Sequence, residues 1–309
     1  MTPTAGALKR ATLVLLLAAL IWGSMIPILS ALAQHYDKWL LSWMRYVLGL
    51  PVLWLAVWLS VSPAATPRPL RWDRMLKLGS AMTVFSVLYT FGVAHAHPAT
   101  SAIVLMCGPI WATVLSRLML GTGTPQGFAL TLLLVVAGGV LVVLGAPHKG
   151  PRKFGLEGGE PLLVIAQLCW SWYSIQAQRW LGNRGQIVLS ALSSTMASFL
   201  LGLVCAAVWL AGGIALPAMA PSAADWGMLA WIGLFGVAVA VLLWNTGVSL
   251  VGVPVASLFA NSAPVFSIAL AAAMGRQPTW LQLAGGAIVM FGIGQHQLRQ
   301  VREIGRAHV

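Results

Sequence analysis

The chain is a succession of long apolar runs separated by short polar segments. Ten runs stand out, and each approaches the ~20 residues that an α-helix needs to cross about 30 Å of hydrocarbon. They cover residues 11–33, 39–61, 75–96, 99–120, 127–146, 161–181, 187–211, 226–250, 254–274 and 278–297. The pattern predicts an all-α polytopic membrane protein with ten transmembrane helices.

The composition narrows the class of protein further. Of 309 residues, 59% are apolar and 8% are charged, and the mean hydropathy is +0.86. A soluble domain carries roughly a quarter charged residues, so an ordinary soluble enzyme is excluded. The formal net charge is +12. The cations lie singly or in small groups between apolar runs, so we predict no nucleic-acid partner.

The distribution of Lys and Arg predicts the orientation in the membrane. With the amino terminus inside, twelve cations fall on the cytoplasmic side, five fall outside, and Arg45 lies within a span. This excess predicts that both termini are cytoplasmic. The inner set is Lys9, Arg10, Arg68, Arg71, Arg74, Lys77, Arg117, Arg179, Arg184, Arg299, Arg302 and Arg306; the outer set is Lys38, Lys149, Arg152, Lys153 and Arg276.

Five sequence matches in chain order relate the two halves of the chain. Leu88-Tyr89-Thr90-Phe91-Gly92-Val93 resembles Leu243-Trp244-Asn245-Thr246-Gly247-Val248 at an offset of 155. The other matches are Pro98 and Ser101 with Pro254 and Ser257 at 156, Pro109 with Pro264 at 155, Gly139 with Gly292 at 153, and Leu20-x-Trp22 with Leu168-x-Trp170 at 148. The nearly constant offset predicts a duplicated five-helix unit.

The duplication predicts the organisation of the whole chain. The first repeat covers residues 8–147, an outer linker covers 148–160, the second repeat covers 161–298 and a cytoplasmic tail covers 299–309. Because five is odd, the second repeat enters the membrane inverted relative to the first. Two inverted five-helix repeats are typical of secondary transporters, whose substrate sites lie near the midplane.

These features resemble the EamA branch of the drug/metabolite transporter superfamily over about residues 8–298. The resemblance rests on the duplication, on Trp22-Gly23-Ser24, on the Leu-aromatic-x-x-Gly pattern that ends spans three and eight, and on the proline within spans four and nine. Many members have Gly-Glu where this chain has Gly121-Thr122 and Gly275-Arg276. In its high content of aromatic residues, the chain is similar to the aromatic amino-acid exporters of the YddG type.

The resemblance implies a multi-pass transporter of the bacterial inner (plasma) membrane. It would export aromatic and other neutral amino acids, or similar small amphipathic metabolites, by alternating access. Its partners would be that small-molecule substrate and the lipid bilayer, with no obligatory protein partner. No nucleophile, paired acids or metal ligands are grouped in the sequence, so we expect no enzyme activity, no cofactor and no metal.

The acidic residues bear on the energy source. All six lie outside the spans or at their edges, namely Asp37, Asp73, Glu157, Glu160, Asp225 and Glu303. Proton- and sodium-driven carriers usually hold a carboxylate within the membrane. We therefore predict uncoupled facilitated diffusion. The alternative is a broad drug/metabolite exporter, proton-linked through His95 or His97, which are otherwise interfacial histidines beside Pro98.

Aromatic and amide side chains deep in the spans are the candidates for substrate binding. Rings would stack on an aromatic substrate, and amides would satisfy a zwitterion. The competing interpretation is core packing and interhelical hydrogen bonding. The candidates are Trp22, Ser24, Tyr89, His95, Trp111, Trp170, Tyr173, Gln176, Trp244, Asn245, Asn261 and Ser262.

Three prolines and one arginine complete the set. Pro27, Pro109 and Pro264 are predicted helix breaks or hinges, freeing the carbonyls of the residues four positions earlier. Those carbonyls would line a shared cavity or be satisfied by neighbouring helices. Arg45 either snorkels or makes a structural hydrogen bond, or it holds a substrate carboxylate. The paired glycines Gly138-Gly139 and Gly285-Gly286 are expected at close-packed helix faces.

Overall fold

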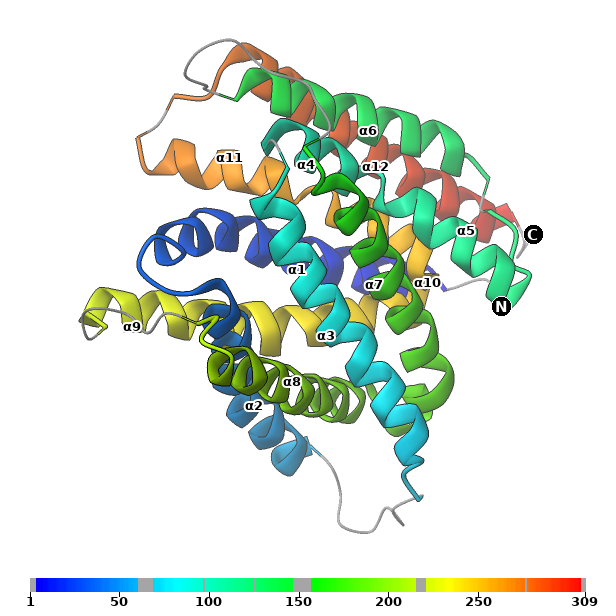
Figure 1. The fold of residues 1–309 in the computed structure, drawn as a ribbon. Coiled ribbons are helices and arrows are strands. Elements are labelled where there is room, and N and C mark those ends of the chain that lie inside the picture. Colours follow the sequence, from blue (N-terminus) through cyan, green and yellow to red (C-terminus); the bar gives the residue numbers. More distant parts are fainter. Residues whose placement is uncertain are drawn as a thin grey trace.

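The computed structural model describes residues 4–60, 69–96, 98–124, 126–146, 157–214, 221–275 and 277–306. Within these ranges the regular structure is entirely helical (Figure 1). The helices are α1 (Ala5–Leu32), α2 (Lys38–Ser60), α3 (Trp72–Ala94), α4 (Pro98–Met106), α5 (Gly108–Leu120), α6 (Phe128–Gly145), α7 (Glu160–Leu181), α8 (Gln186–Leu210), α9 (Ala223–Ala230), α10 (Ala240–Ala260), α11 (Ala263–Ala273) and α12 (Trp280–Arg306), with a 3₁₀ turn η1 (Gly182–Arg184) and a π-helical stretch η2 (Trp231–Val239).

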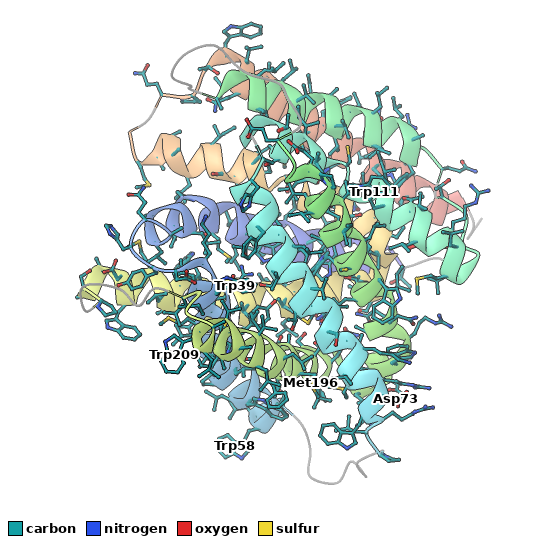
Figure 2. The ribbon with its side chains drawn as sticks, in the orientation of Figure 1. Trp39, Trp58, Asp73, Trp111, Met196 and Trp209 are labelled. Carbon is teal, nitrogen blue, oxygen red and sulfur yellow. The ribbon has the colours of Figure 1, made fainter. Side chains whose placement is uncertain are left out.

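The all-α membrane class predicted from the sequence is confirmed. Within the described ranges, seven helical segments are long and apolar enough to span a membrane: Gly6–Leu29, Lys38–Ser60, Trp72–Val93, Thr100–Leu120, Phe128–Gly145, Gln186–Leu210 and Ala223–Ala260. Large apolar side chains cover the outside, as a lipid solvent requires. Figure 2 shows Trp58 and Trp209 at the periphery, where they are 77% and 55% exposed.

Seven is fewer than the ten spans that the sequence predicts, and one segment explains part of the difference. Ala223–Ala260 has 38 residues, which as one helix would be about 57 Å long and far exceed the hydrocarbon thickness. The chain leaves helical geometry at Gly252 (φ 78°, ψ 165°), between the predicted runs 226–250 and 254–274. The other helices of the predicted spans do not count among the seven. α11 is too short, with only 11 residues, and α7 and α12 carry more polar side chains than the seven segments.

The helix contacts made by the first half of the chain recur in the second half. In the predicted duplication, α7 corresponds to α1, α8 to α2, η2 with α10 to α3, and α12 to α6. α1 packs on α10 and α7 packs on α3; likewise α2 packs on η2 and α8 packs on α3. α2 also contacts α8, and α6 contacts α12 along most of their length. Figure 1 shows the beginning of α1 and the end of α12 at the same end of the molecule. Each contact within this set therefore has a counterpart, or pairs two equivalent helices.

Glycines of the repeated pattern occupy matching contacts. A Cβ atom on Gly92 of α3 would meet the Leu163 side chain of α7, and one on Gly247 of α10 would meet Leu15 of α1. α6 and α12 touch through their backbones, since a Cβ on Gly138 would lie 2.6 Å from the Gly285 carbonyl oxygen. The expected close-packed glycine faces are therefore present between α6 and α12.

Candidate functional site

Four helices bring six aromatic rings together in a group that we call the central ring cluster. Trp170 of α7 is its hub, with ring centroids 6.0 Å from Trp22, 4.9 Å from Phe85, 5.3 Å from Tyr173 and 5.8 Å from Trp244. The members are Trp22 from α1, Phe85 and Tyr89 from α3, Trp170 and Tyr173 from α7, and Trp244 from α10. Both halves of the chain thus contribute to one cluster.

The rings of the cluster differ in burial. Trp244 is 1% exposed and Tyr173 is 0% exposed, whereas Trp22, Tyr89 and Trp170 keep part of their surface accessible. Trp244 and Tyr173, which the surrounding protein encloses, form a fixed support for the other rings. The partly exposed rings are the ones that a bound molecule could contact.

Polar groups anchor the buried rings from behind. The Trp244 indole nitrogen donates to Ser174 Oγ at 3.0 Å. The Asn245 amide nitrogen donates to Ser190 Oγ at 2.9 Å and to the Tyr173 hydroxyl at 3.3 Å. The Asn245 Oδ1 atom is buried without a hydrogen-bond partner. Asn245 therefore orients the support of the cluster and keeps one unused acceptor, which is an unfavourable state unless something occupies it.

The backbone carbonyls that the helix break near Pro109 leaves free accept hydrogen bonds from neighbouring helices. α4 ends at Met106 and α5 begins at Gly108. The Gln167 amide nitrogen donates to the Leu105 carbonyl, 3.1 Å away, and the Asn261 amide nitrogen donates to the Met106 carbonyl, 2.7 Å away. The predicted free carbonyl of Leu105 thus has a partner. Sequence reasoning missed Gln167, although an isolated amide in an apolar run was the available signal.

Several predicted residues lie away from the ring cluster. His95 is exposed beyond the end of α3, where its ring stacks on Phe91 with centroids 5.9 Å apart; His97 lies outside the described residues. Ser24 accepts a hydrogen bond from Trp231 at 3.0 Å. Ser262, between α10 and α11, donates to the Phe259 carbonyl in the last turn of α10 at 2.6 Å.

The other candidates have environments of their own. The Trp111 Nε1 and Gln176 Oε1 atoms are buried without partners, and neither ring nor amide belongs to the cluster as defined. Pro27 is exposed within α1, and Pro264 stands in the first turn of α11. Phe85, a cluster member, was missed because a lone phenylalanine in an apolar run reads as core.

Arg45 of α2 lies beside the cluster. Its Nη2 atom donates to Ser86 Oγ on α3 at 2.7 Å, and its guanidinium carbon is 5.6 Å from the Tyr46 ring centroid. The Nε atom is buried without a hydrogen-bond partner. Arg45 forms no ion pair in the part of the chain that the structure describes.

The end of α3 is tied to the start of α7. The backbone N–H of Gly159 donates to the His95 carbonyl at 3.0 Å. Buried Glu160 accepts from Thr100 Oγ1 at 3.0 Å and from the backbone N–H of Gly158 at 3.1 Å. A hydrogen bond from its own backbone N–H, together with these, lowers the Glu160 pKa from its ordinary value against the opposing effect of burial.

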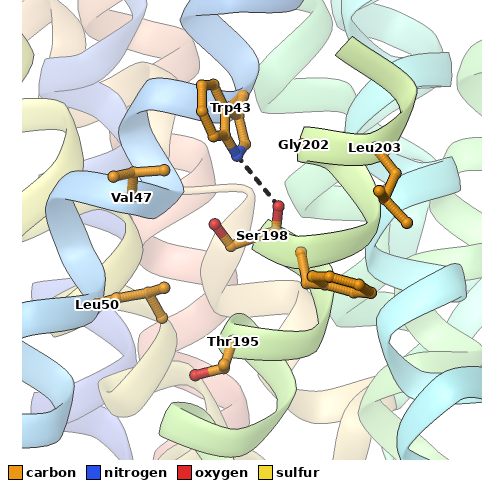
Figure 3. Close-up of a pocket in the computed structure, with 8 residues that line it drawn as sticks. Trp43, Val47, Leu50, Thr195, Ser198, Gly202 and Leu203 are labelled. Atoms are coloured by element: carbon orange, nitrogen blue, oxygen red, sulfur yellow. Dashed lines mark hydrogen bonds between the residues drawn. The ribbon is translucent and has the colours of Figure 1, made fainter. Parts of the chain in front are cut away.

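Two hollows lie outside the ring cluster. An apolar groove of about 370 Å³ runs between α2 and α8, crossed by a hydrogen bond of 3.1 Å from Trp43 Nε1 to the Ser198 carbonyl (Figure 3). A second hollow of about 320 Å³ is bordered by Tyr36, Asp37 and Phe91. The described rings of the central cluster contact one another and border neither hollow.

Comparison with known proteins gives a consistent family. The EamA-like transporter family matches residues 9–144 and again residues 158–294. Three Bacillus subtilis (strain 168) proteins named as uncharacterized transporters are similar. YrdR is 23% identical (96% of this chain, 94% of its own), YetK is 23% identical (89% and 83%), and YyaM is 22% identical (68% and 67%).

A solved crystal structure shares the fold. It superposes with a TM-score of 0.78 at 21% sequence identity, over 95% of this chain and 98% of the other. The agreement covers nearly the whole of both chains, so it bears on the complete helical arrangement.

Proposed function

The chain belongs to the EamA-like transporter family, and from this premise we propose that it exports aromatic and other neutral amino acids by alternating access. The partners in this proposal are the amino acid and the lipid bilayer. The protein is located in a bacterial inner membrane, with both of its termini in the cytoplasm. Transport is uncoupled facilitated diffusion down the gradient of the substrate.

The proposed architecture is ten spans in two inverted five-helix repeats, residues 8–147 and 161–298, joined by the linker 148–160 and followed by the tail 299–309. Residues 148–156 and 307–309 lie outside the described part of the chain. Two family matches of similar length support the duplication. The paired packing of α1 on α10 and α7 on α3 supports a two-fold relation between the halves.

The observation that carries the substrate class is the central ring cluster. Its rings come from α1, α3, α7 and α10, where the two halves meet. A substrate ring that stacked on the partly exposed members would gain about 0.5–1.5 kcal/mol for each pair beyond its burial. When the halves rock apart, the rings would exchange contacts with one another for contacts with the substrate.

Uncoupled transport is supported by the placement of the acids. Asp37, Glu157 and Glu160 lie in loops or at helix ends, and Asp73 and Asp225 lie in the first turns of α3 and α9. None of these five reaches the depth of the ring cluster. A carboxylate that could bind a proton or sodium during the cycle is thus missing from the described membrane interior.

Uptake into liposomes tests the proposal. Liposomes with the purified protein should take up labelled tryptophan or phenylalanine without a proton or sodium gradient, and unlabelled substrate inside should accelerate uptake by counterflow. Empty liposomes are the control. Uptake that required a proton gradient and fell in His95→Gln would favour the proton-linked alternative. Competition by cationic dyes but not by amino acids would favour a broad drug exporter.

A further inference from the structure

Arg45 is a cation held inside the apolar part of the protein. It stands seven residues after the start of α2 at Lys38, and Ser86, its hydrogen-bond partner, stands eight residues before the end of α3 at Ala94. At 1.5 Å per residue, both lie about 10–12 Å inside the ends of their helices. The guanidinium is therefore bonded at its own depth instead of reaching toward the interface.

The protein leaves the charge of Arg45 unmatched. One guanidinium nitrogen is bonded to the neutral Ser86 hydroxyl at 2.7 Å, the Tyr46 ring lies beside the guanidinium at 5.6 Å, and the Nε hydrogen has no acceptor. No carboxylate in the described chain pairs with it. A cation at membrane depth is costly and is retained where it serves a pathway or a ligand. Its free donors suit a carboxylate, which binds guanidinium through two parallel hydrogen bonds.

The charge borders the aromatic surface through α3. Ser86 stands three residues before Tyr89 on α3 and Phe85 stands four residues before it, and residues three or four apart are neighbours on a helix face. The Tyr89 and Phe85 rings are 5.6 Å apart, and Phe85 is 4.9 Å from Trp170. A ligand with an acidic group at Arg45 would therefore place its ring beside Tyr89 and Phe85.

We propose that Arg45 binds the carboxylate of the transported molecule, so that the pathway selects aromatic carboxylates and discriminates against aromatic amines that lack one. This inference rests on the proposed function and names the group that the site recognises. The ammonium of an amino acid meets no carboxylate in this arrangement, because the described acids lie in loops or near the ends of their helices. Removing the ammonium should therefore cost less affinity than removing the carboxylate.

Binding to the purified full-length protein in detergent tests the inference without requiring transport. The ligands are tryptophan, indole-3-propionate, which lacks the ammonium, and tryptamine, which lacks the carboxylate. We expect the wild type to bind both carboxylates at least ten-fold more tightly than tryptamine. Arg45→Gln should lose at least ten-fold affinity for the two carboxylates and keep its tryptamine affinity, which also reports that it is folded. Arg45→Lys should retain an intermediate affinity.

The matched control is Arg74→Gln, since Arg74 is a cation of α3 that lies 5.7 Å from the Trp180 ring and outside the cluster. It should bind all three ligands as the wild type does. Equal affinity of wild type and Arg45→Gln for the carboxylates would overturn the inference, and so would tryptamine binding as tight as tryptophan binding.

A second ligand pair separates this inference from the proposed function. Leucine and 3-methylbutylamine differ by the same carboxylate but carry no ring. If the wild type ignores aromatic ligands, the proposed aromatic substrate class fails. A leucine affinity that depends on Arg45 would then still support carboxylate binding, and a leucine affinity that does not depend on Arg45 would overturn it.

Discussion

Single residues decide how the ring cluster is built. Trp170 contacts four other rings, whereas Tyr89 contacts only Phe85 among the cluster members. Trp170 is also partly exposed, while Trp244 and Tyr173 are enclosed and hydrogen-bonded. Trp170 therefore joins the fixed support to the rings that a substrate could meet. Its side chain is the best single position at which to test the aromatic surface.

Replacing Trp170 tests whether its ring contributes to substrate binding. Trp170→Ala should lower tryptophan uptake by roughly two-fold to ten-fold, since the lost pair between the Trp170 ring and the substrate ring amounts to about 0.5–1.5 kcal/mol beyond its burial. Trp170→Phe should retain most uptake because a ring remains. Trp209→Ala, at an exposed peripheral position, serves as control. Equal uptake by wild type and Trp170→Ala would exclude a binding role for this ring.

At the scale of helices, contact between backbones fixes the pairing of α6 and α12. Gly138 and Gly285 face each other, so that a Cβ on either one would collide with the backbone of the other helix. Small residues that permit such an approach are the usual basis of helix association in lipid, where no hydrophobic force drives helices together. Gly294 also lies on α12 but has open space around it.

The contrast between two glycines of α12 gives a stability prediction. Gly285→Ala should destabilise the protein by about 1–3 kcal/mol, because its Cβ would overlap the Gly138 carbonyl. Gly294→Ala should be neutral or stabilising by up to ~1 kcal/mol through helix propensity. Thermal unfolding in detergent measures both. Equal unfolding temperatures for the two variants would contradict tight packing at Gly285.

At the scale of the whole molecule, the sequence predicts what depends on composition and spacing. The apolar runs predict the helices, and the offset of about 155 predicts the matching contacts of Gly92 and Gly247. The sequence could not predict which side chains bond to the free carbonyls near Pro109. The donors, Gln167 and Asn261, come from segments that are distant from Pro109 in sequence. Likewise, Phe85 could not be recognised as a member of the ring cluster from the sequence, because its membership depends on its contact with the Trp170 ring.

The proposed inversion of the two repeats makes a prediction about the sides of the membrane. The α1–α2 connection and the α7–α8 connection are equivalent in the two repeats, and each offers an exposed residue, Gln34 and Asn183 respectively. Inverted repeats place these residues on opposite sides, whereas parallel repeats place them on the same side. In intact cells, a membrane-impermeant maleimide should label Gln34→Cys but not Asn183→Cys until the membrane is opened. The wild type controls for Cys107, Cys169 and Cys205, which are free thiols at least partly buried. Labelling of both variants from outside would show that the second repeat is not inverted, and the shared midplane site would lose its architectural basis.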